Sequence, residues 1–171
     1  MSHLVFLDLE TTGLDEKKHQ VWEAAYAIND DDVKSSLLNH ALKNANPVAL
    51  GINNYSERIK AWVDTNSGFA ERNAWETKLR AVLAGATLVA ANPTFDATML
   101  KARWGEAPWA YRMIDLEAYA MPYLGLDRPR GLAYIAEKLG VEAPDHSARQ
   151  DVVTLRQCYR LLQDKYQIPR G

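Results

Sequence analysis

The sequence predicts a mixed α/β fold, in which strands form one sheet and helices flank it. The chain begins with an apolar run from Leu4 to Leu7, which is typical of a strand in the centre of a sheet. The first three strand-like segments follow one another directly, and beyond them strands alternate with helices. No linker interrupts these segments, so residues 1–171 are expected to form a single domain.

About five strands are expected, and turn or loop residues separate most of them. A polar loop that contains Gly13 follows the first strand, and three acidic residues at 30–32 form a turn after the second. Residues 44–47 break the pattern after the third. The expected strands are residues 4–9, 21–29, 33–43, 87–92 and 111–115.

Helices are expected mainly in the second half of the chain. Residues 69–84 carry apolar side chains at helical spacing, among them Leu79 and Leu83. Gly140 is a usual C-terminal cap for the segment that precedes it. The expected helices are residues 54–63, 69–84, 95–104, 116–123, 132–139 and 148–166.

The composition excludes several classes of protein. Charged residues of both signs make up 25% of the chain and the formal net charge is −2, so this is not a strongly basic nucleic-acid coat protein. An enzyme that binds a few nucleotides and takes its positive charge from metal ions is compatible with this balance. The single cysteine, Cys158, cannot form an intrachain disulfide and is expected to pack in the core. No membrane span and no secretory signal is found, so we expect a cytoplasmic protein.

Two carboxylates stand at the end of the first strand. Asp8 and Glu10 are two positions apart, so a strand projects them from the same face. Carboxylates this close repel each other unless a cation compensates them. Ligand sites of α/β sheets favour the C-terminal ends of strands, which favours a cation site here. The alternative is that Asp8 only ends the strand and Glu10 is solvated.

A third acid follows the strand at 87–92. Asn92 suits the N-cap of the next helix and Pro93 its first position, which places Asp96 in the first helical turn. A catalytic role is one interpretation of this carboxylate. The alternative is a carboxylate that only stabilises the helix dipole, by ~0.3–1 kcal/mol.

A fourth acid and a histidine lie close together before the last helix. Ser147 and Gln150 have the spacing of a capping box, so the helix begins just after Ser147 and holds Asp151 in its first turns. His146 then lies in the loop outside the helix, where it is free to move. Each residue alone has an ordinary structural explanation. Four acids and one histidine at three such junctions are not expected by accident, so together they indicate a functional site.

Three segments resemble the motifs of the DEDDh 3′→5′ exonucleases, the relatives of the proofreading epsilon subunit of bacterial polymerase III. They are DLETTGL at residues 8–14, NPTFD at 92–96 and HSARQD at 146–151, and they follow the family's order. The resemblance implies an RNase H-like fold, with a mixed sheet of about five strands, the second antiparallel, flanked by helices.

The resemblance also implies a role for each residue at a motif position. His146 matches the general base, and the acids that match the ligands of two divalent cations, Mg²⁺ or Mn²⁺, are Asp8, Glu10, Asp96 and Asp151. The substrate-binding positions are matched by Thr11, Thr12, Leu14, Asn92 and Phe95. Leu14 is a candidate wedge against the terminal base. Pro93 departs from the family pattern and leaves the role of Asn92 open, and core packing is an alternative for Phe95.

The chemistry of phosphodiester hydrolysis agrees with these roles. Negative charge builds on the attacking and leaving oxygens, and two cations about 3.5–4 Å apart can stabilise it. Oxygen ligands suit Mg²⁺ and Mn²⁺. A free imidazole has a pKa of about 6.5 and can accept a proton from the attacking water near neutral pH.

We therefore expect a metal-dependent 3′→5′ exonuclease that acts on single-stranded or frayed DNA ends and releases nucleoside monophosphates. Proofreading beside a polymerase and free-standing repair or degradation both stay open as its role. The alternatives are an exoribonuclease of the same superfamily that acts on short RNA, and a non-catalytic nucleic-acid-binding adaptor that keeps the fold. A DNA polymerase and a second copy of the chain, in a homodimer, stay open as partners. No membrane partner is expected.

Several large or charged side chains outside the motifs allow two interpretations. Trp22 is expected in the core because it lies on a central strand, whereas Trp104 and Trp109 stay open as stacking surfaces for bases. Arg128 and Arg130 precede a helix, and a solvated turn is favoured over phosphate contacts for both.

Overall fold

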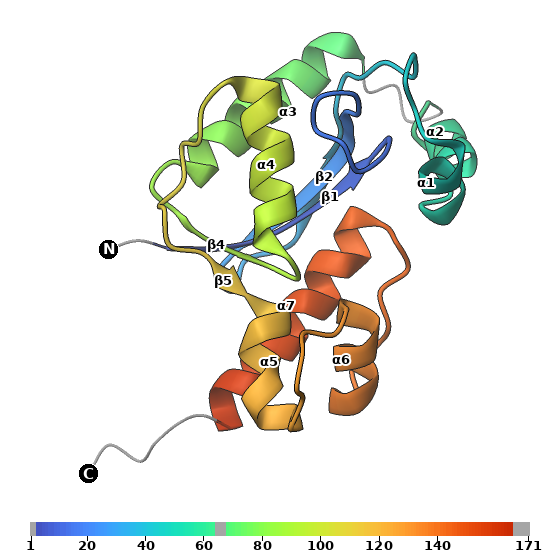
Figure 1. Cartoon of the computed structure of the whole chain (residues 1–171). Coiled ribbons are helices and arrows are strands. Elements are labelled where there is room, and N and C mark those ends of the chain that lie inside the picture. The colour runs from blue at the N-terminus through green and yellow to red at the C-terminus, as the bar shows by residue number, and fades with distance from the viewer. Residues whose placement is uncertain (1–2, 64–67, 166–171) are drawn as a thin grey trace.

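A five-stranded mixed sheet lies at the centre of the computed structural model, which describes residues 3–63 and 68–165 (Figure 1). The strands are β1 (Leu4–Thr11), β2 (Val21–Ile28), β3 (Lys34–Leu37), β4 (Thr87–Ala90) and β5 (Ile114–Asp115). Their order is β3-β2-β1-β4-β5. β2 is antiparallel to both β1 and β3, whereas β4 is parallel to both β1 and β5. The predicted mixed sheet, its five strands and its antiparallel second strand are confirmed.

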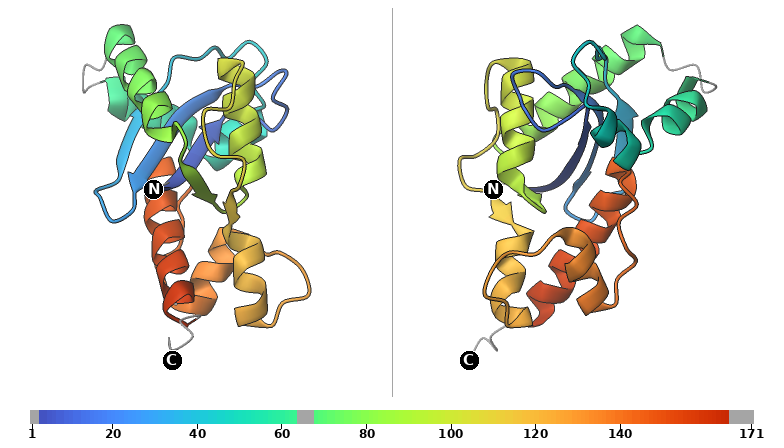
Figure 2. Two further views of the ribbon diagram at one scale, coloured as in Figure 1. Left: turned by 90° about the vertical axis from the view of Figure 1, so that its left-hand side faces the viewer. Right: turned by 45° about the vertical axis from the view of Figure 1, so that its right-hand side comes forward.

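Helices cover both faces of this sheet (Figures 1 and 2). α3 and α4 lie on one face, and α5, α6 and α7 lie on the other. Two shorter helices, α1 and α2, lie beyond the sheet and close to the start of α7. The bounds are α1 (Pro47–Ile52), α2 (Tyr55–Val63), α3 (Phe69–Leu83), α4 (Pro93–Trp104), α5 (Leu116–Leu124), α6 (Leu132–Leu139) and α7 (Ala148–Lys165). No helix among these described residues is both long and apolar enough to cross a membrane.

The side chains of β1 alternate between two hydrophobic cores, as a central strand requires. Val5, Leu7 and Leu9 belong to the core that α3 and α4 complete. Phe6 points the other way, into the core that α5, α6 and α7 complete. Asp8 and Glu10 share the face of Phe6, so both carboxylates point toward the side of the sheet covered by α7.

The third strand is shorter than predicted. β3 covers only Lys34–Leu37, whereas residues 33–43 were expected to be extended. β3 pairs with β2, and its last residue, Leu37, lies opposite Glu23. Because β2 begins only two residues before Glu23, at Val21, β3 has almost no further partner beyond Leu37. The fifth strand is also shorter than the expected residues 111–115, since only Ile114 and Asp115 pair with β4.

α1 was not predicted, although its start carries a recognisable signal. The backbone N–H of Val48 donates to Oδ1 of the N-cap Asn46 over 2.9 Å, and Pro47 is the first helical residue. This is the same Asn-Pro pattern that predicted α4 at residues 92–93. The end of the predicted last helix, residue 166, lies outside the described residues.

Trp22, Trp104 and Trp109 pack within the protein rather than present free stacking surfaces. Trp22 is fully buried, as predicted. Trp104 and Trp109 are half-buried against the α3/α4 core, with ring centroids 6.3 Å apart. Trp104 Nε1 also donates a 2.7 Å hydrogen bond to Glu76, so its ring is fixed within the protein.

We expect the Cys158 thiol to be inert in the native protein. Its side chain is 0% exposed, as predicted for a core residue, and burial raises the pKa of the thiol to about 12. Since the thiolate is the reactive species, a water-soluble disulfide reagent should react only after unfolding in guanidinium. Absorbance of the released chromophore measures this reaction. Rapid reaction of the folded protein would contradict the packing of α7 against the sheet.

Candidate active site

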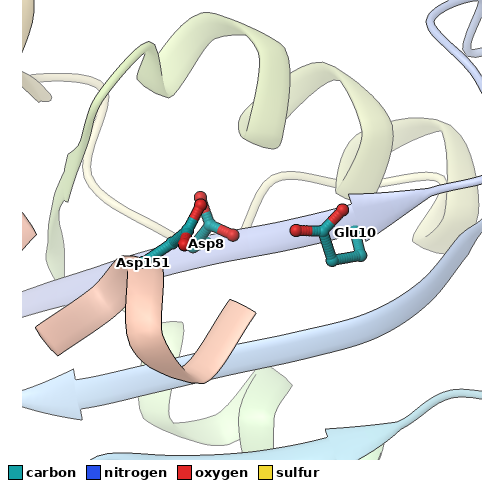
Figure 3. A group of neighbouring side chains, drawn as sticks. All are labelled: Asp8, Glu10 and Asp151. Atoms are coloured by element: carbon teal, nitrogen blue, oxygen red, sulfur yellow. The ribbon is translucent and has the colours of Figure 1, made fainter. Parts of the chain in front are cut away.

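Three carboxylates meet where β1 approaches the start of α7. Asp8 and Glu10 project from the same face of β1, as predicted, and Asp151 reaches them from the first turn of α7. Each offers one carboxylate oxygen, and these oxygens all lie within 4.8 Å of one another. Figure 3 shows the carboxylates of Asp8 and Asp151 next to each other, with Glu10 farther along β1. The sequence-predicted spacing therefore produces a group of acids that a cation can bridge.

Asp96 approaches the same region from α4. The helix begins at Pro93 after the N-cap Asn92, so Asp96 falls in the first turn, and it is buried. Asn92 makes no side-chain capping hydrogen bond, so only its position as N-cap is confirmed. The Asp96 carboxylate accepts hydrogen bonds from the backbone N–H groups of Asp96 and Leu9. The bond from Leu9 attaches α4 to β1 beside Asp8.

A pocket of about 240 Å³ collects these groups. All four predicted acids and His146 line it, together with Asn92 and Phe95. Phe95 also packs against the α3/α4 core, which confirms the alternative of core packing, and its contact with substrate stays a prediction. Thr11, Thr12 and Leu14 do not line this pocket and lie in or next to the loop that follows β1.

The four acids of this pocket have higher pKa values than ordinary carboxyl groups. Burial is the main cause, and it raises the pKa of Glu10 to about 8 with help from the charges of Asp151 and Glu23. Burial, followed by the charges of Asp96 and Asp151, raises the pKa of Asp8 well above its ordinary value. Burial likewise raises the pKa of Asp96 and of Asp151. All the potential ligand atoms are carboxylate oxygens, and such ligands fit hard divalent cations.

The comparisons with known proteins agree with this geometry. A family model described as RNase_T, Exonuclease, matches residues 5–159. The chain belongs to this exonuclease family. The comparison with curated proteins found no match to this chain. The predicted resemblance to the DEDDh exonucleases is thereby confirmed at the level of the family.

Solved structures of exonucleases share the fold. One is the zinc-bound complex of E. coli ExoI with single-stranded DNA, with a TM-score of 0.70 and 18% identity over 98% of this chain and 41% of that chain. Another is the nuclease domain of 3′hExo, described as a DEDDh family member bound to rAMP, with a TM-score of 0.62 and 14% identity over 95% and 92%. A third is a 3′-exonuclease that recognises a histone mRNA stem-loop, with a TM-score of 0.65 and 12% identity over 95% and 82%. This exonuclease chain spans less than half the length of the ExoI structure.

We expect the metal-free exonuclease to lose stability as the pH rises. Acids with raised pKa values hold their protons more tightly in the folded state than in the unfolded state, where their pKa is about 4. Their contribution to the free energy of unfolding is therefore present at low pH and is lost between about pH 5 and the pKa of Glu10, about 8. Melting curves in chelator should show this fall.

Divalent cations should reverse that trend, because the ionised acids then have a bound counter-charge. Mg²⁺ or Mn²⁺ should raise the melting temperature more at pH 8 than at pH 6. An equal rise at both pH values would contradict cation binding by these acids. Ca²⁺-free Na⁺ buffer of the same ionic strength is the control.

The loop of His146 is more firmly held than predicted. Oδ1 of Asp151 accepts the backbone N–H of Asp145 over 3.1 Å, and Oδ1 of Asp145 accepts that of Ser147 over 2.8 Å. The backbone of His146 has φ 60°, a left-handed conformation that few non-glycine residues adopt. The side chain is exposed at the pocket, but its backbone is not free to move as the sequence suggested.

The predicted capping box is half formed. The backbone N–H of Gln150 donates to Oγ of Ser147 over 3.2 Å, which confirms Ser147 as the N-cap. The side chain of Gln150 instead donates to Thr154, and Asp145 takes the backbone N–H of Ser147. An acid of the active-site loop thus replaces the second half of the box.

The loop after β1 holds its own polar groups and exposes Leu14. Thr11 donates its hydroxyl to the carbonyl of Gly13 over 2.8 Å, and the Thr12 hydroxyl accepts the backbone N–H of Gln20 over 2.9 Å. Both threonines are buried, whereas Leu14 is 78% exposed. Gly13 has φ +151°, and a Cβ added there would lie 2.5 Å from the His19 ring. This turn therefore requires glycine.

Three residues near the site were not predicted from the sequence. Glu23 on β2 lies opposite Glu10 in the sheet and forms a salt bridge with Arg58 of α2. Asn53, next to α1, donates to the carbonyl of Thr11 over 3.1 Å and to the Glu10 carboxylate. A single Glu inside the apolar segment VWEAAYAI was a usable signal for Glu23. Nothing in the local pattern singles out Arg58 or Asn53.

Proposed function

We propose that this chain is a metal-dependent 3′→5′ exonuclease that hydrolyses phosphodiester bonds at the 3′ end of single-stranded DNA and releases nucleoside monophosphates. The observation that carries this proposal is that one pocket is lined by all five predicted catalytic residues, Asp8, Glu10, Asp96, Asp151 and His146. Membership of the exonuclease family supports the reaction. The structural neighbour described as a 3′-exonuclease supports the 3′ end as the point of attack.

The residues of this chain divide the work in the proposed mechanism. The four acids would hold two divalent cations, Mg²⁺ or Mn²⁺, which supply charge stabilisation for the attacking and leaving oxygens. His146 accepts the proton of the attacking water at the exposed side of the pocket. Asp151 holds the backbone of the same loop, so one residue joins the acids to the base.

Without cations, the acids of the pocket would repel the phosphate groups of the substrate. The oxygens of Asp8, Glu10 and Asp151 lie within 4.8 Å of one another, and a phosphate brought to them adds more negative charge. Cations make the same arrangement favourable for substrate. We therefore infer that nucleic acid binds this pocket only together with divalent metal.

DNA is the proposed substrate and RNA is the second candidate. ExoI, described in complex with single-stranded DNA, has the higher TM-score, 0.70. RNA is favoured by the two neighbours described with rAMP and with a histone mRNA stem-loop. Single-stranded DNA and RNA of matched sequence, and a DNA with one 2′-hydroxyl on its last nucleotide, test the choice. Cleavage of DNA at least about tenfold faster, which is 1.4 kcal/mol in the barrier, supports the first proposal, and the reverse order supports the second.

Leu14 is proposed to separate the terminal base from its neighbour. It is exposed on the loop that follows β1, four positions after Glu10 in the sequence. Leu14→Ala should raise KM for single-stranded DNA about threefold to tenfold, with kcat and Mn²⁺ affinity unchanged, since loss of an apolar contact with one base costs about 0.7–1.4 kcal/mol. Steady-state kinetics measure this. Leu42→Ala, which removes another exposed leucine, is the control, and equal effects of the two changes would contradict the assignment.

Three further points belong to the same proposal. Residues 1–171 are taken as one exonuclease domain, supported by the family match to residues 5–159 and by the single sheet of the described residues.

If DNA is the substrate, a role in proofreading or DNA repair, with a polymerase as a partner, is the role that we propose. The free, buried cysteine is compatible with the proposed cytoplasmic location.

A further inference from the structure

Arg58 occupies an unusual position for a residue on a short peripheral helix. It lies on α2, and its guanidinium stacks 4.9 Å above the ring of the buried Trp22. It also pairs with Glu23, and the side chains are only 17% and 3% exposed. An arginine buried in this way has been taken out of water, and its partners decide what it does.

One arm of the guanidinium holds the sheet and the other holds the active-site loop. Nη2 pairs with the Glu23 carboxylate on β2, while Nη1 donates to the backbone carbonyl of His146 over 2.8 Å. The planar fork of arginine can serve both partners at once, which the single ammonium of lysine cannot do. Arg58 therefore connects the sheet with His146, a residue 88 positions away in the sequence.

Glu23 completes this connection from the other side of His146. Its Oε2 accepts the backbone N–H of Ala148 over 3.4 Å, at the first residue of α7. The carbonyl of His146 and the N–H of Ala148 are thus both held by one ion pair. This matters because His146 has φ 60°, and a strained backbone persists only where its surroundings determine it.

α2 is itself fixed against the sheet, so Arg58 has a rigid base. Tyr55 lies with its ring 5.0 Å from that of Trp22, edge to face. Its hydroxyl is 2.6 Å from Nε2 of His40, and His40 Nδ1 is 2.8 Å from the carbonyl of Leu38. The helix that carries Arg58 is therefore attached to the β2–β3 side of the sheet.

We propose that Arg58, together with Glu23, is a positioning residue for His146, which it aims into the pocket of acids without touching substrate or metal. This inference rests on the proposed role of His146 as general base. The competing explanation is that Arg58 only neutralises the buried Glu23. The two explanations differ in what lysine can replace, since lysine keeps the charge and loses the fork.

The test compares Arg58→Lys, Arg58→Gln, His146→Ala and the double variant Arg58→Lys/His146→Ala by steady-state kinetics on single-stranded DNA with Mn²⁺. Arg58→Lys should lower kcat about tenfold to a hundredfold, with KM and calorimetric Mn²⁺ affinity within about twofold of wild type. The double variant should be no slower than His146→Ala alone, because a positioning residue has nothing left to position. Arg149→Lys is the control, since Arg149 also donates to a backbone carbonyl, that of Val33.

A second measurement does not depend on activity. Hydrogen exchange of the backbone amides at residues 145–148 should be faster in Arg58→Lys than in wild type and unchanged in Arg149→Lys. Wild-type kcat in Arg58→Lys, losses that multiply in the double variant, or unchanged exchange would each overturn the positioning role. If wild-type protein cleaves no oligonucleotide, the proposed function fails, and loop exchange alone then decides whether Arg58 holds His146.

Discussion

Replacing Asp8 with Asn is expected to abolish hydrolysis and at the same time to stabilise the metal-free protein. Asp8 is the acid whose charge is opposed by all the others, since Asp96, Asp151, Glu10 and Glu23 each raise its pKa in addition to burial. In the proposed mechanism, Asn replaces one anionic ligand oxygen of Asp8 with an NH2 group and so weakens the binding of the cations that would stabilise the reacting oxygens. We expect kcat to fall about a thousandfold or more, which is about 4 kcal/mol.

The gain in stability has the same physical origin as the loss of activity. In chelator at pH 8, Asn removes one of several buried like charges, so the melting temperature should rise, by about 2–4 °C for each kcal/mol gained. Scanning fluorimetry and steady-state kinetics on one preparation measure both effects. Asp127→Asn, on the exposed loop between α5 and α6, is the control and should change neither. A variant that is inactive but less stable in chelator would indicate misfolding instead of loss of a ligand.

Replacing His146 with Ala is expected to slow hydrolysis while leaving metal binding intact. General-base catalysis contributes about a hundredfold to ten-thousandfold, and kcat should fall within that range. Mn²⁺ affinity, measured by calorimetry, should stay within about twofold because the three-acid cluster is formed without the imidazole.

His3→Ala is the matched control, since His3 contacts the carbonyl of Val82 near the beginning of β1. It should keep the kcat of the wild-type chain. A loss of Mn²⁺ affinity in His146→Ala equal to the loss in Asp8→Asn would make His146 a ligand instead of a base. That result would move the proton-accepting role to another group.

The sequence predicts the sheet and the helices that pack on it well, for reasons visible in particular residues. The run Leu4 to Leu7 is apolar because β1 has neighbours on both edges and a core on both faces. Gly140 ends α6 with φ 70°, as the pattern predicts. α1 was missed because none of its residues is buried, so it has no hydrophobic periodicity to detect.

The sequence predicts the acids of the candidate site, but it does not predict the residues that hold the loop of His146 in place. Asp8 and Glu10 are close in sequence and share a strand, so local geometry alone places them together. Arg58 meets Glu23 and His146 only through the tertiary fold, across 35 and 88 positions in sequence. The hydrogen bond that holds the backbone of His146 was missed for the same reason, since its donor lies on a distant helix.

The central claim is that the pocket of acids cleaves nucleic acid from the 3′ end with divalent metal. Digestion of a 5′-labelled single-stranded DNA with Mg²⁺ or Mn²⁺, beside an identical reaction in chelator, tests it most directly. The account predicts a ladder that shortens one nucleotide at a time from the 3′ end and vanishes in chelator. Immediate release of the labelled 5′ nucleotide, internal cleavage, or no cleavage by folded protein of either DNA or matched RNA would contradict it.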